Sequence, residues 1–223
     1  MNVKLLIEAI LKFILGVILV GLLIFIPAGT INYLNGWLFM GLLFIPMFIA
    51  GIVMMIKSPN LLKSRINAKE TEKEQKEVVA LSGLMFLVGF IIAGLNHRYN
   101  WIQIPNIIVI ISSIIFLLSY ILYAEVLREN TFLSRTIEVQ NNQKVIDTGL
   151  YKIVRHPMYS VTIFLFLSMP LVLGSVISFI IFLIYPFIIA KRIKNEEQVL
   201  EKELKGYKEY KNKVKYRLIP FIW

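Results

Sequence analysis

Two polar segments of this sequence flank one long apolar run, and both carry side chains that could bind a charged small molecule. The first segment, residues 140–159, reads QNNQKVIDTGLYKIVRHPMY, and the second, residues 191–200, reads KRIKNEEQVL. Arg155 and His156 stand immediately before Pro157, a residue type that is favoured in the first turn of a helix. The free backbone N–H groups of a helix start, together with these two side chains, favour a carboxylate or a phosphate.

The acidic pair Glu196–Glu197 in the second segment has the opposite preference, for an ammonium group, ribose hydroxyls or both. Tyr151 and Tyr159 in the first segment offer π faces to a cation or to an adenine ring. A ligand with a carboxylate, an ammonium, a sulfonium, a ribose and an adenine would use all of these groups, and S-adenosylmethionine is such a ligand. A nicotinamide cofactor would need more cationic groups and would gain nothing from paired glutamates.

The spacing of Arg192 and Glu196 adds a possible catalytic role. The two residues are four apart, so in a helix they lie on one face, one turn from each other. A helix that binds the cofactor through Glu196 would present Arg192 one turn nearer the membrane, where it could orient an anionic nucleophile for in-line attack on a methyl group. Methyl transfer depends mainly on such alignment and on desolvation. In isolation the two residues would be better explained as an exposed ion pair worth less than about 1 kcal/mol, but with Glu197 and the RHPMY segment packed against them we favour a binding site.

The element that must bring the two segments together is the apolar run between them, Ser160–Ala190, with Pro170 and the pair Gly174–Ser175 near its middle. We interpret this run as a hairpin of two helices, the first of which begins near Pro157. Because a hairpin brings its ends together, RHPMY and NEE should be neighbours although they lie about 35 residues apart in the sequence. They would then line one pocket.

The rest of the chain predicts a membrane protein. Hydrophobic residues make up 57% of the 223 residues, only 17% are charged, and the mean hydropathy is +0.72, whereas a soluble domain has roughly a quarter of its residues charged. Residues 13–56 carry no charge and suffice for two spans, and residues 78–95 and 101–124 give two more. We therefore predict an all-α, single-domain bundle of about six transmembrane helices. Residues 1–127 would form four N-terminal helices, and residues 128–223 would form a loop, the hairpin and a tail around a cytoplasmic cofactor pocket.

The distribution of charge predicts the orientation and excludes several partners. Residues 57–77, 128–159 and 191–223 contain 6, 5 and 10 Lys and Arg residues, and the opposite-side connections contain one, Arg98. The positive-inside rule therefore places both termini and the pocket on the cytoplasmic side of an integral, multi-pass membrane protein. The net charge of +10 fits anionic lipid headgroups better than nucleic acid. With no cysteine and two histidines, His97 and His156, a metal site is not expected.

Two charged segments have simpler interpretations. The mixed-charge run Lys69–Glu77 is most simply a solvated cytoplasmic helix or loop. Lys202–Lys215 reads as an amphipathic helix that lies on the headgroups or covers the pocket. Arg217, which follows it, suits two roles equally, orientation of substrate or binding of a lipid phosphate.

These motifs together resemble the isoprenylcysteine carboxyl methyltransferase family, especially its bacterial members. The resemblance rests on residues 140–159, Arg192-x-x-x-Glu196-Glu197, Gly206-Tyr207-x-x-Tyr210 and the segment YRLIP at residues 216–220. Weaker similarity extends through residues 125–140, with Asn130 and Ser134 in matching places, and to residues 58–65. The resemblance implies a membrane methyltransferase that uses S-adenosylmethionine and acts on a lipophilic acceptor, such as a prenylated thioether carboxylate.

The resemblance also implies roles for individual residues. Arg192 matches an arginine next to the substrate, and we assign it with Arg217 as the candidate catalytic residues. The candidate cofactor-binding residues are Gln140, Gln143, Lys144, Val145, Ile146, Tyr151, Arg155, His156, Pro157, Met158, Tyr159, Glu196 and Glu197.

Three alternatives remain open at the level of sequence. Sterol reductases, which use NADPH, share the fold, an RHPxY-like motif and a similar C-terminal end, but they usually read RHPNY and lack the acidic pair. Phospholipid N-methyltransferases share the acidic pair but have Gly-x-Gly where this chain has Asp147-Thr148-Gly149. A non-enzymatic membrane scaffold or transport-related protein is the third. Binding of NADPH in place of S-adenosylmethionine by the purified protein would indicate the reductase, and binding of neither cofactor would favour the scaffold.

Overall fold

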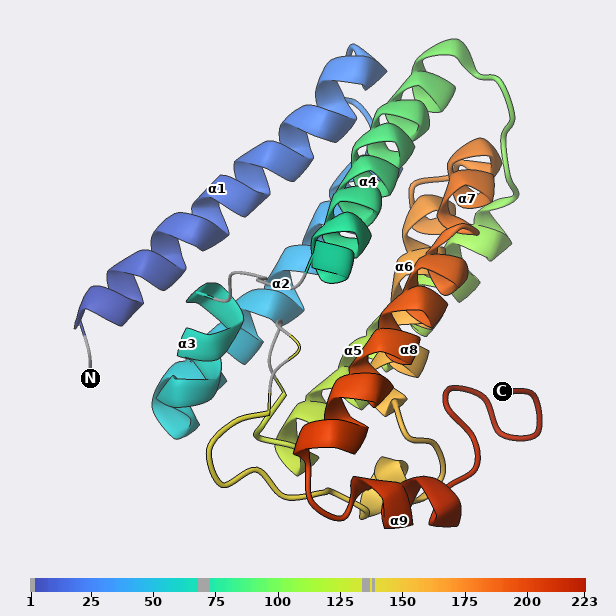
Figure 1. Ribbon diagram of the computed structural model, residues 1–223. Coiled ribbons are helices and arrows are strands. Elements are labelled where there is room, and N and C mark those ends of the chain that lie inside the picture. Colours follow the sequence, from blue (N-terminus) through green and yellow to red (C-terminus); the bar gives the residue numbers. More distant parts are fainter. Residues whose placement is uncertain (1–2, 68–72, 134–136, 138) are drawn as a thin grey trace.

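The computed structural model describes residues 3–67, 73–133, 137 and 139–223, and within them all regular structure is helical (Figure 1). The helices are α1 (Val3–Ala28), α2 (Leu34–Lys57), α3 (Pro59–Asn67), α4 (Lys73–Tyr99), α5 (Asn106–Glu129), the 3-10 helix η1 (Gly149–Lys152), α6 (Pro157–Val172), α7 (Val176–Phe182), α8 (Tyr185–Glu203) and α9 (Tyr207–Lys213). The prediction of an all-α fold is confirmed for this part of the chain.

Five helical segments of the described chain are long and apolar enough to cross a membrane: α1, α2, α4 from Gln75 onward, α5, and the continuous stretch Val176–Glu203 formed by α7 and α8. The four N-terminal spans predicted from the sequence are among them. The first arm of the predicted hairpin, α6, is apolar but has only 16 residues. At 1.5 Å per residue it is about 24 Å long, less than the roughly 30 Å of a bilayer core. A sixth complete span therefore stays a prediction.

Two glycines of α4 allow this helix to pack closely against its neighbours. A Cβ on Gly94 would lie 2.5 Å from the backbone oxygen of Ile24 in α1, and a Cβ on Gly89 would lie 2.2 Å from the ring of Phe182 in α7. The Ser178 hydroxyl also donates to the Gly89 carbonyl oxygen, at 2.8 Å. Small residues permit such close contact between helix backbones inside a bilayer, so α4 joins the N-terminal helices to the C-terminal hairpin.

The hairpin begins and turns at the residues that the sequence indicated. Helix α6 starts at Pro157, and the chain reverses at Gly174, whose φ of +77° is a conformation that glycine adopts without strain. Ser175 then caps α7 by accepting a hydrogen bond from the Ser178 N–H. Helix α6 packs against α5, α7 and α8, which sets the ends of α6 and α8 beside each other.

The sequence predicted one amphipathic helix over Lys202–Lys215, and this prediction is wrong, because the segment is not one continuous helix. Helix α8 ends at Glu203, and Gly206, with φ +88°, turns the chain into the separate short helix α9. Tyr207 and Tyr210 of α9 are buried. Because its aromatic face packs inward, α9 covers the end of the bundle (Figure 1).

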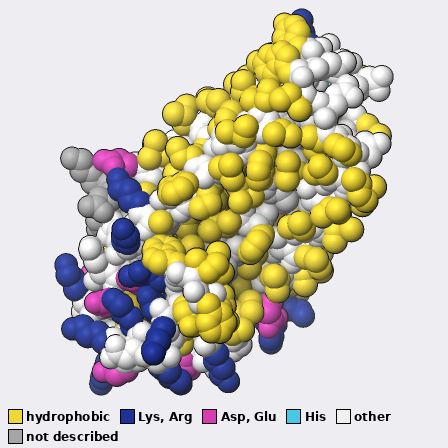
Figure 2. Space-filling view, turned by 90° about the vertical axis from the view of Figure 1, so that its right-hand side faces the viewer, with side chains coloured by type: hydrophobic (Ala, Val, Ile, Leu, Met, Phe, Trp, Pro, Cys, Tyr) yellow, Lys and Arg dark blue, Asp and Glu magenta, His cyan; other side chains and the backbone are white. Residues whose placement is uncertain are grey.

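The mixed-charge run Lys69–Glu77 is also not simply solvated. Residues 68–72 lie outside the described residues, but α4 begins at Lys73, and the Gln75 side chain is fully buried. Most of the charged side chains on the visible face gather at one end of the molecule, and apolar side chains cover much of the rest of that face (Figure 2).

Candidate functional site

The two polar segments of the sequence meet where α6 starts and the second half of α8 passes it. The Tyr159 hydroxyl donates to Glu196 Oε2 at 2.5 Å, and His156 Nε2 lies 3.3 Å from Glu197 Oε1. The prediction that RHPMY and the acidic pair are neighbours in space is confirmed. The hairpin of α6, α7 and α8 produces this contact.

The two glutamates of the pair occupy different environments. The Glu197 side chain is 4% exposed and accepts hydrogen bonds from Arg155 Nε at 2.7 Å and from Arg217 Nε at 2.9 Å. The Glu196 side chain is 21% exposed and faces a cavity. A buried carboxylate needs such pairing to offset its desolvation. Glu197 therefore holds the hairpin and the tail together, while Glu196 is available to a ligand.

The C-terminal tail accepts hydrogen bonds from backbone N–H groups next to the start of α6, where the sequence predicted that an anion would bind. The N–H groups of Arg155 and His156 donate to the carbonyl oxygens of Tyr216 and Arg217, each at 2.9 Å. The Arg155 guanidinium also donates to the carbonyl oxygen of Val214 at 2.7 Å. These two N–H groups consequently bind the tail. The tail, which contains the YRLIP motif, therefore holds the RHPMY segment in place.

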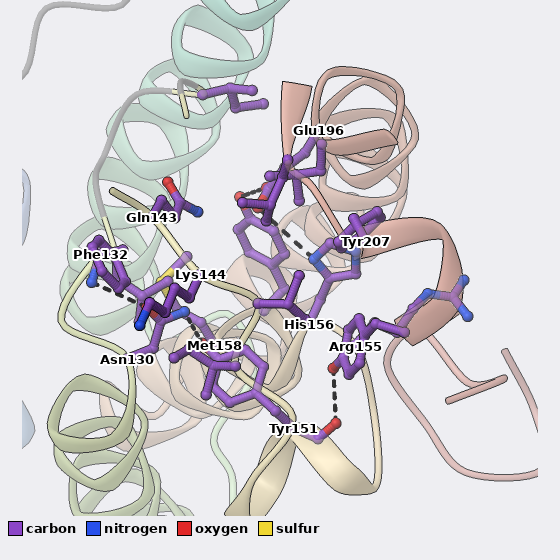
Figure 3. A pocket seen from close by; sticks show the side chains of 18 of the residues that line it. Asn130, Phe132, Gln143, Lys144, Tyr151, Arg155, His156, Met158, Glu196 and Tyr207 are labelled. Atoms are coloured by element: carbon purple, nitrogen blue, oxygen red, sulfur yellow. Dashed lines mark hydrogen bonds and ion pairs between the residues drawn. The ribbon is translucent and has the colours of Figure 1, made fainter. Parts of the chain in front are cut away.

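A cavity of about 810 Å³, solvent at its mouth included, opens beside this junction, and we name it the polar cavity. Figure 3 shows Glu196, His156 and Tyr207 on one side of it and Gln143, Lys144 and Phe132 on the other. The loop after α5, the start of α6, the second half of α8 and α9 all contribute to its lining. The cavity therefore exists only because distant parts of the chain converge.

Most of the residues assigned from the sequence line the polar cavity. They are Gln143, Lys144, Val145, Ile146, Tyr151, Arg155, His156, Met158, Tyr159, Arg192 and Glu196. The other four assigned residues, Gln140, Pro157, Glu197 and Arg217, are not among the residues that line it.

Those four residues shape the site from behind. Gln140 donates through its N–H to the side chain of Gln143 and through its amide to the carbonyl oxygen of Phe132, both at 2.8 Å, and so folds the loop. Pro157 opens α6. Arg217 donates to Glu197, and its guanidinium lies 5.1 Å from the centre of the Trp223 ring.

Sequence reasoning assigned no role to the remaining residues that line the polar cavity. They are Asn130, Phe132, Leu133, Ile137, Leu200, Leu204, Tyr207 and Tyr210. Asn130 was marked by the resemblance alone; its amide donates to the Tyr151 hydroxyl at 3.0 Å. Ser134, marked in the same way, lies outside the described residues. The motif Gly206-Tyr207-x-x-Tyr210 was the signal for the two tyrosines, whose spacing of three places both on one face of α9.

Tyr207 tests whether the cavity suits S-adenosylmethionine. Its side chain is buried, and its hydroxyl has no hydrogen-bond partner within the described parts of the chain. Burial, reinforced by the nearby Glu197 and Glu196, raises the pKa of this hydroxyl well above its usual range, so it stays a neutral donor. An unpaired buried hydroxyl is costly, and a polar ligand would satisfy it. With Glu196 for an ammonium or ribose, Lys144 for a carboxylate and several aromatic rings, the residues present fit this cofactor.

A second cavity, which we name the apolar cavity, lies next to the first. It encloses about 950 Å³, solvent included, and α4, α6 and α8 contribute most of its lining, with Phe86, Phe166 and Ile189 among the apolar side chains. Three residues, Met158, Tyr159 and Arg192, line both cavities. The two spaces are therefore adjacent and separated by these side chains.

Tyr159 and Arg192 form a hydrogen-bonded chain at this boundary. The Tyr159 hydroxyl donates to Glu196 and accepts from Arg192 Nε at 2.8 Å. Arg192 Nη1 donates to Gln75 Oε1 at 2.9 Å. A glutamate that faces the polar cavity is thus linked to an arginine that faces the apolar one.

Comparison with known proteins agrees with this arrangement. The model of the isoprenylcysteine carboxyl methyltransferase (ICMT) family matches residues 108–202, from the start of α5 to the end of α8. No curated protein matches the chain. The match includes both polar segments and the hairpin, but not α4, α9 or the tail. It confirms the family inferred from the sequence and supports a membrane methyltransferase. Residues 108–202 therefore match the model of the isoprenylcysteine carboxyl methyltransferase family, the family that the sequence motifs resemble.

Proposed function

We propose that this protein transfers a methyl group from S-adenosylmethionine to the carboxylate of a lipophilic acceptor that enters from the bilayer. The observation that carries the proposal is the pair of adjacent cavities, one polar and one apolar, that meet at Tyr159 and Arg192. A polar cofactor and an apolar acceptor need two such compartments with one shared boundary.

The polar cavity would hold the cofactor. Glu196 would bind its ammonium or ribose, Tyr207 would donate a hydrogen bond, and Lys144 would pair with its carboxylate. Tyr151 and Tyr210 offer aromatic faces on the same cavity. S-adenosylmethionine would supply a methyl group on a sulfonium, which the acceptor oxygen takes as the carbon–sulfur electron pair returns to sulfur, so no proton needs to be removed.

The apolar cavity would hold the acceptor. The charged side chains among the residues that line it are Arg65 and Arg192, and both are cations. Arg192 lies at the boundary, where its guanidinium can orient a carboxylate toward the polar cavity. Alignment of this kind supplies much of the rate enhancement in a reaction that needs no covalent intermediate. The cationic boundary favours an anionic acceptor over an amine.

The direct test is methyl transfer from radiolabelled S-adenosylmethionine to N-acetyl-S-farnesylcysteine, a small prenylated thioether carboxylate. Purified protein in detergent or nanodiscs should transfer the label to this acceptor. Treatment of the product with base should then release the label as volatile methanol, because a methyl ester hydrolyses to a carboxylate and methanol. A matched acceptor in which a carboxamide replaces the carboxylate should accept no methyl group. Failure of the wild-type protein to label host lipids, the prenylated acid or any membrane extract would contradict the proposal, as would binding of NADPH in place of S-adenosylmethionine.

A further inference from the structure

Gln75 lies in the first turn of α4, at the end of the helix that the charge distribution predicts to face the cytoplasm. It is outside the segment that the family model matches. It sits in a run of charged residues and would be expected in water. Its side chain is nevertheless 0% exposed. A fully buried glutamine requires an explanation.

The amide of Gln75 contacts Arg192. Arg192 Nη1 donates to Gln75 Oε1 at 2.9 Å, and because a guanidinium can only donate, the amide oxygen must be the atom that faces it. The Gln75 Nε2 atom is buried and has no hydrogen-bond partner within residues 3–67, 73–133, 137 and 139–223. An unpaired buried amide nitrogen weakens the folded state. An apolar side chain of similar length would avoid that cost but would remove the acceptor of Arg192 Nη1, so the contact with Arg192 is what accounts for a glutamine here.

Gln75 gives Arg192 a second point of attachment. Tyr159 of α6 accepts from Arg192 Nε, and Gln75 of α4 accepts from Nη1. Acceptors on two different helices restrict the plane of a guanidinium more than either acceptor does alone. Arg192 lines both cavities, while Gln75 lines neither. The hydrogen bond to Arg192 thus links Gln75 to a side chain that lines both cavities.

We propose that Gln75 is a positioning residue that orients the Arg192 guanidinium toward the acceptor carboxylate. The inference rests on the proposed function, since it assigns to α4 a part in aligning the same acceptor. It also explains why a helix outside the matched family segment contributes a buried polar side chain to the boundary between the cavities.

Two substitutions separate positioning from structural support. Gln75→Met removes the acceptor oxygen at nearly constant volume, and Gln75→Glu keeps an oxygen opposite Arg192. Four quantities are measured for each variant: the thermal unfolding midpoint, the calorimetric Kd for S-adenosylmethionine, the Kd for N-acetyl-S-farnesylcysteine in the presence of S-adenosylhomocysteine, and kcat with that acceptor.

For Gln75→Met we expect kcat to fall at least about tenfold, the factor that corresponds to one lost hydrogen bond to a charged group. The Kd for S-adenosylmethionine should stay within about twofold of wild type, and the unfolding midpoint should change little, because removal of the unpaired amide nitrogen offsets the lost hydrogen bond to Arg192. Gln75→Glu should recover part of kcat while it weakens acceptor binding, because its carboxylate competes with that of the acceptor for Arg192.

A Gln75→Met protein with wild-type kcat and wild-type acceptor binding would overturn the inference and leave the proposed function intact. Parallel losses of unfolding midpoint, cofactor binding and kcat would also overturn it, since they would mark Gln75 as structural. A wild-type protein that neither binds S-adenosylmethionine nor methylates the acceptor would overturn the proposed function and the inference together.

Discussion

At the scale of single residues, Tyr159 is the side chain on which the two halves of the site depend. Its one hydroxyl donates to Glu196 and accepts from Arg192, and its ring lies on both cavities. A neutral hydroxyl can serve a carboxylate and a guanidinium at once, which a phenylalanine could not do.

Tyr207 provides a test that separates ligand binding from stability. If its unpaired hydroxyl donates to the cofactor, Tyr207→Phe should raise the Kd for S-adenosylmethionine about tenfold, the equivalent of about 1.4 kcal/mol. The unfolding midpoint should stay constant or rise, because the substitution removes a buried group that has no partner within the described residues.

Calorimetry and thermal unfolding on the same preparation check this prediction. Tyr210→Phe is the matched control, since the Tyr210 hydroxyl already donates to the Tyr151 carbonyl oxygen at 2.7 Å. That variant should lose stability. Equal cofactor affinity in wild type and Tyr207→Phe would remove Tyr207 from the binding site.

The sequence predicted which residue types form the site better than it predicted the role of each residue. The pair Glu196–Glu197 was assigned to the cofactor as a unit, but only Glu196 faces the polar cavity, because Arg155 and Arg217 enclose Glu197. Their hydrogen bonds depend on how the tail folds back, which spacing does not encode. Gln75 was missed for a related reason, since its charged neighbours indicate solvent and only the packing of α4 shows its burial.

At the scale of elements, the hairpin α6–α7–α8 was predictable and the C-terminal region was not. A proline, a glycine and a long apolar run were enough to place the start of α6 and the turn at Gly174. The break in the helix at Gly206 was not predictable from the sequence, because a glycine inside a charged amphipathic pattern also fits a continuous helix. Burial of Tyr207 and Tyr210 against the bundle decided the geometry.

Gly83 of α4 tests the role of the apolar cavity. It lines that cavity, and a Cβ built on it meets no atom within 4 Å. Gly83→Trp should therefore fold normally and fill the space, lowering kcat/KM for N-acetyl-S-farnesylcysteine at least about tenfold through lost acceptor binding. The affinity for S-adenosylmethionine should be unchanged.

Gly51→Trp is the matched control. A Cβ on Gly51 in α2 also meets no atom within 4 Å, and Gly51 does not line either of the two cavities. Its kinetics should equal those of wild type. If Gly83→Trp methylates the farnesylated acceptor as fast as the control, the acceptor does not occupy the apolar cavity.

At the scale of the whole molecule, the charge asymmetry predicts which end lies in the cytoplasm. Because the sequence contains no cysteine, a single introduced cysteine can report which side of the membrane it lies on. Lys213 carries a side chain that is 68% exposed, and Gln103 is exposed between α4 and α5. In intact spheroplasts, Gln103→Cys should react with a membrane-impermeant maleimide, and Lys213→Cys should react only after permeabilisation. The opposite pattern would place the polar cavity on the outer side and contradict the orientation that we propose.

The central claim is that the polar cavity, with Glu196 facing it, binds S-adenosylmethionine. Calorimetric titration of purified wild-type protein with this cofactor tests it most directly, with Glu196→Gln as the comparison. The account predicts saturable binding by wild type and at least about tenfold weaker binding by Glu196→Gln, because a charge-assisted hydrogen bond becomes a neutral one. No binding by wild type, or the same affinity in both proteins, would contradict it.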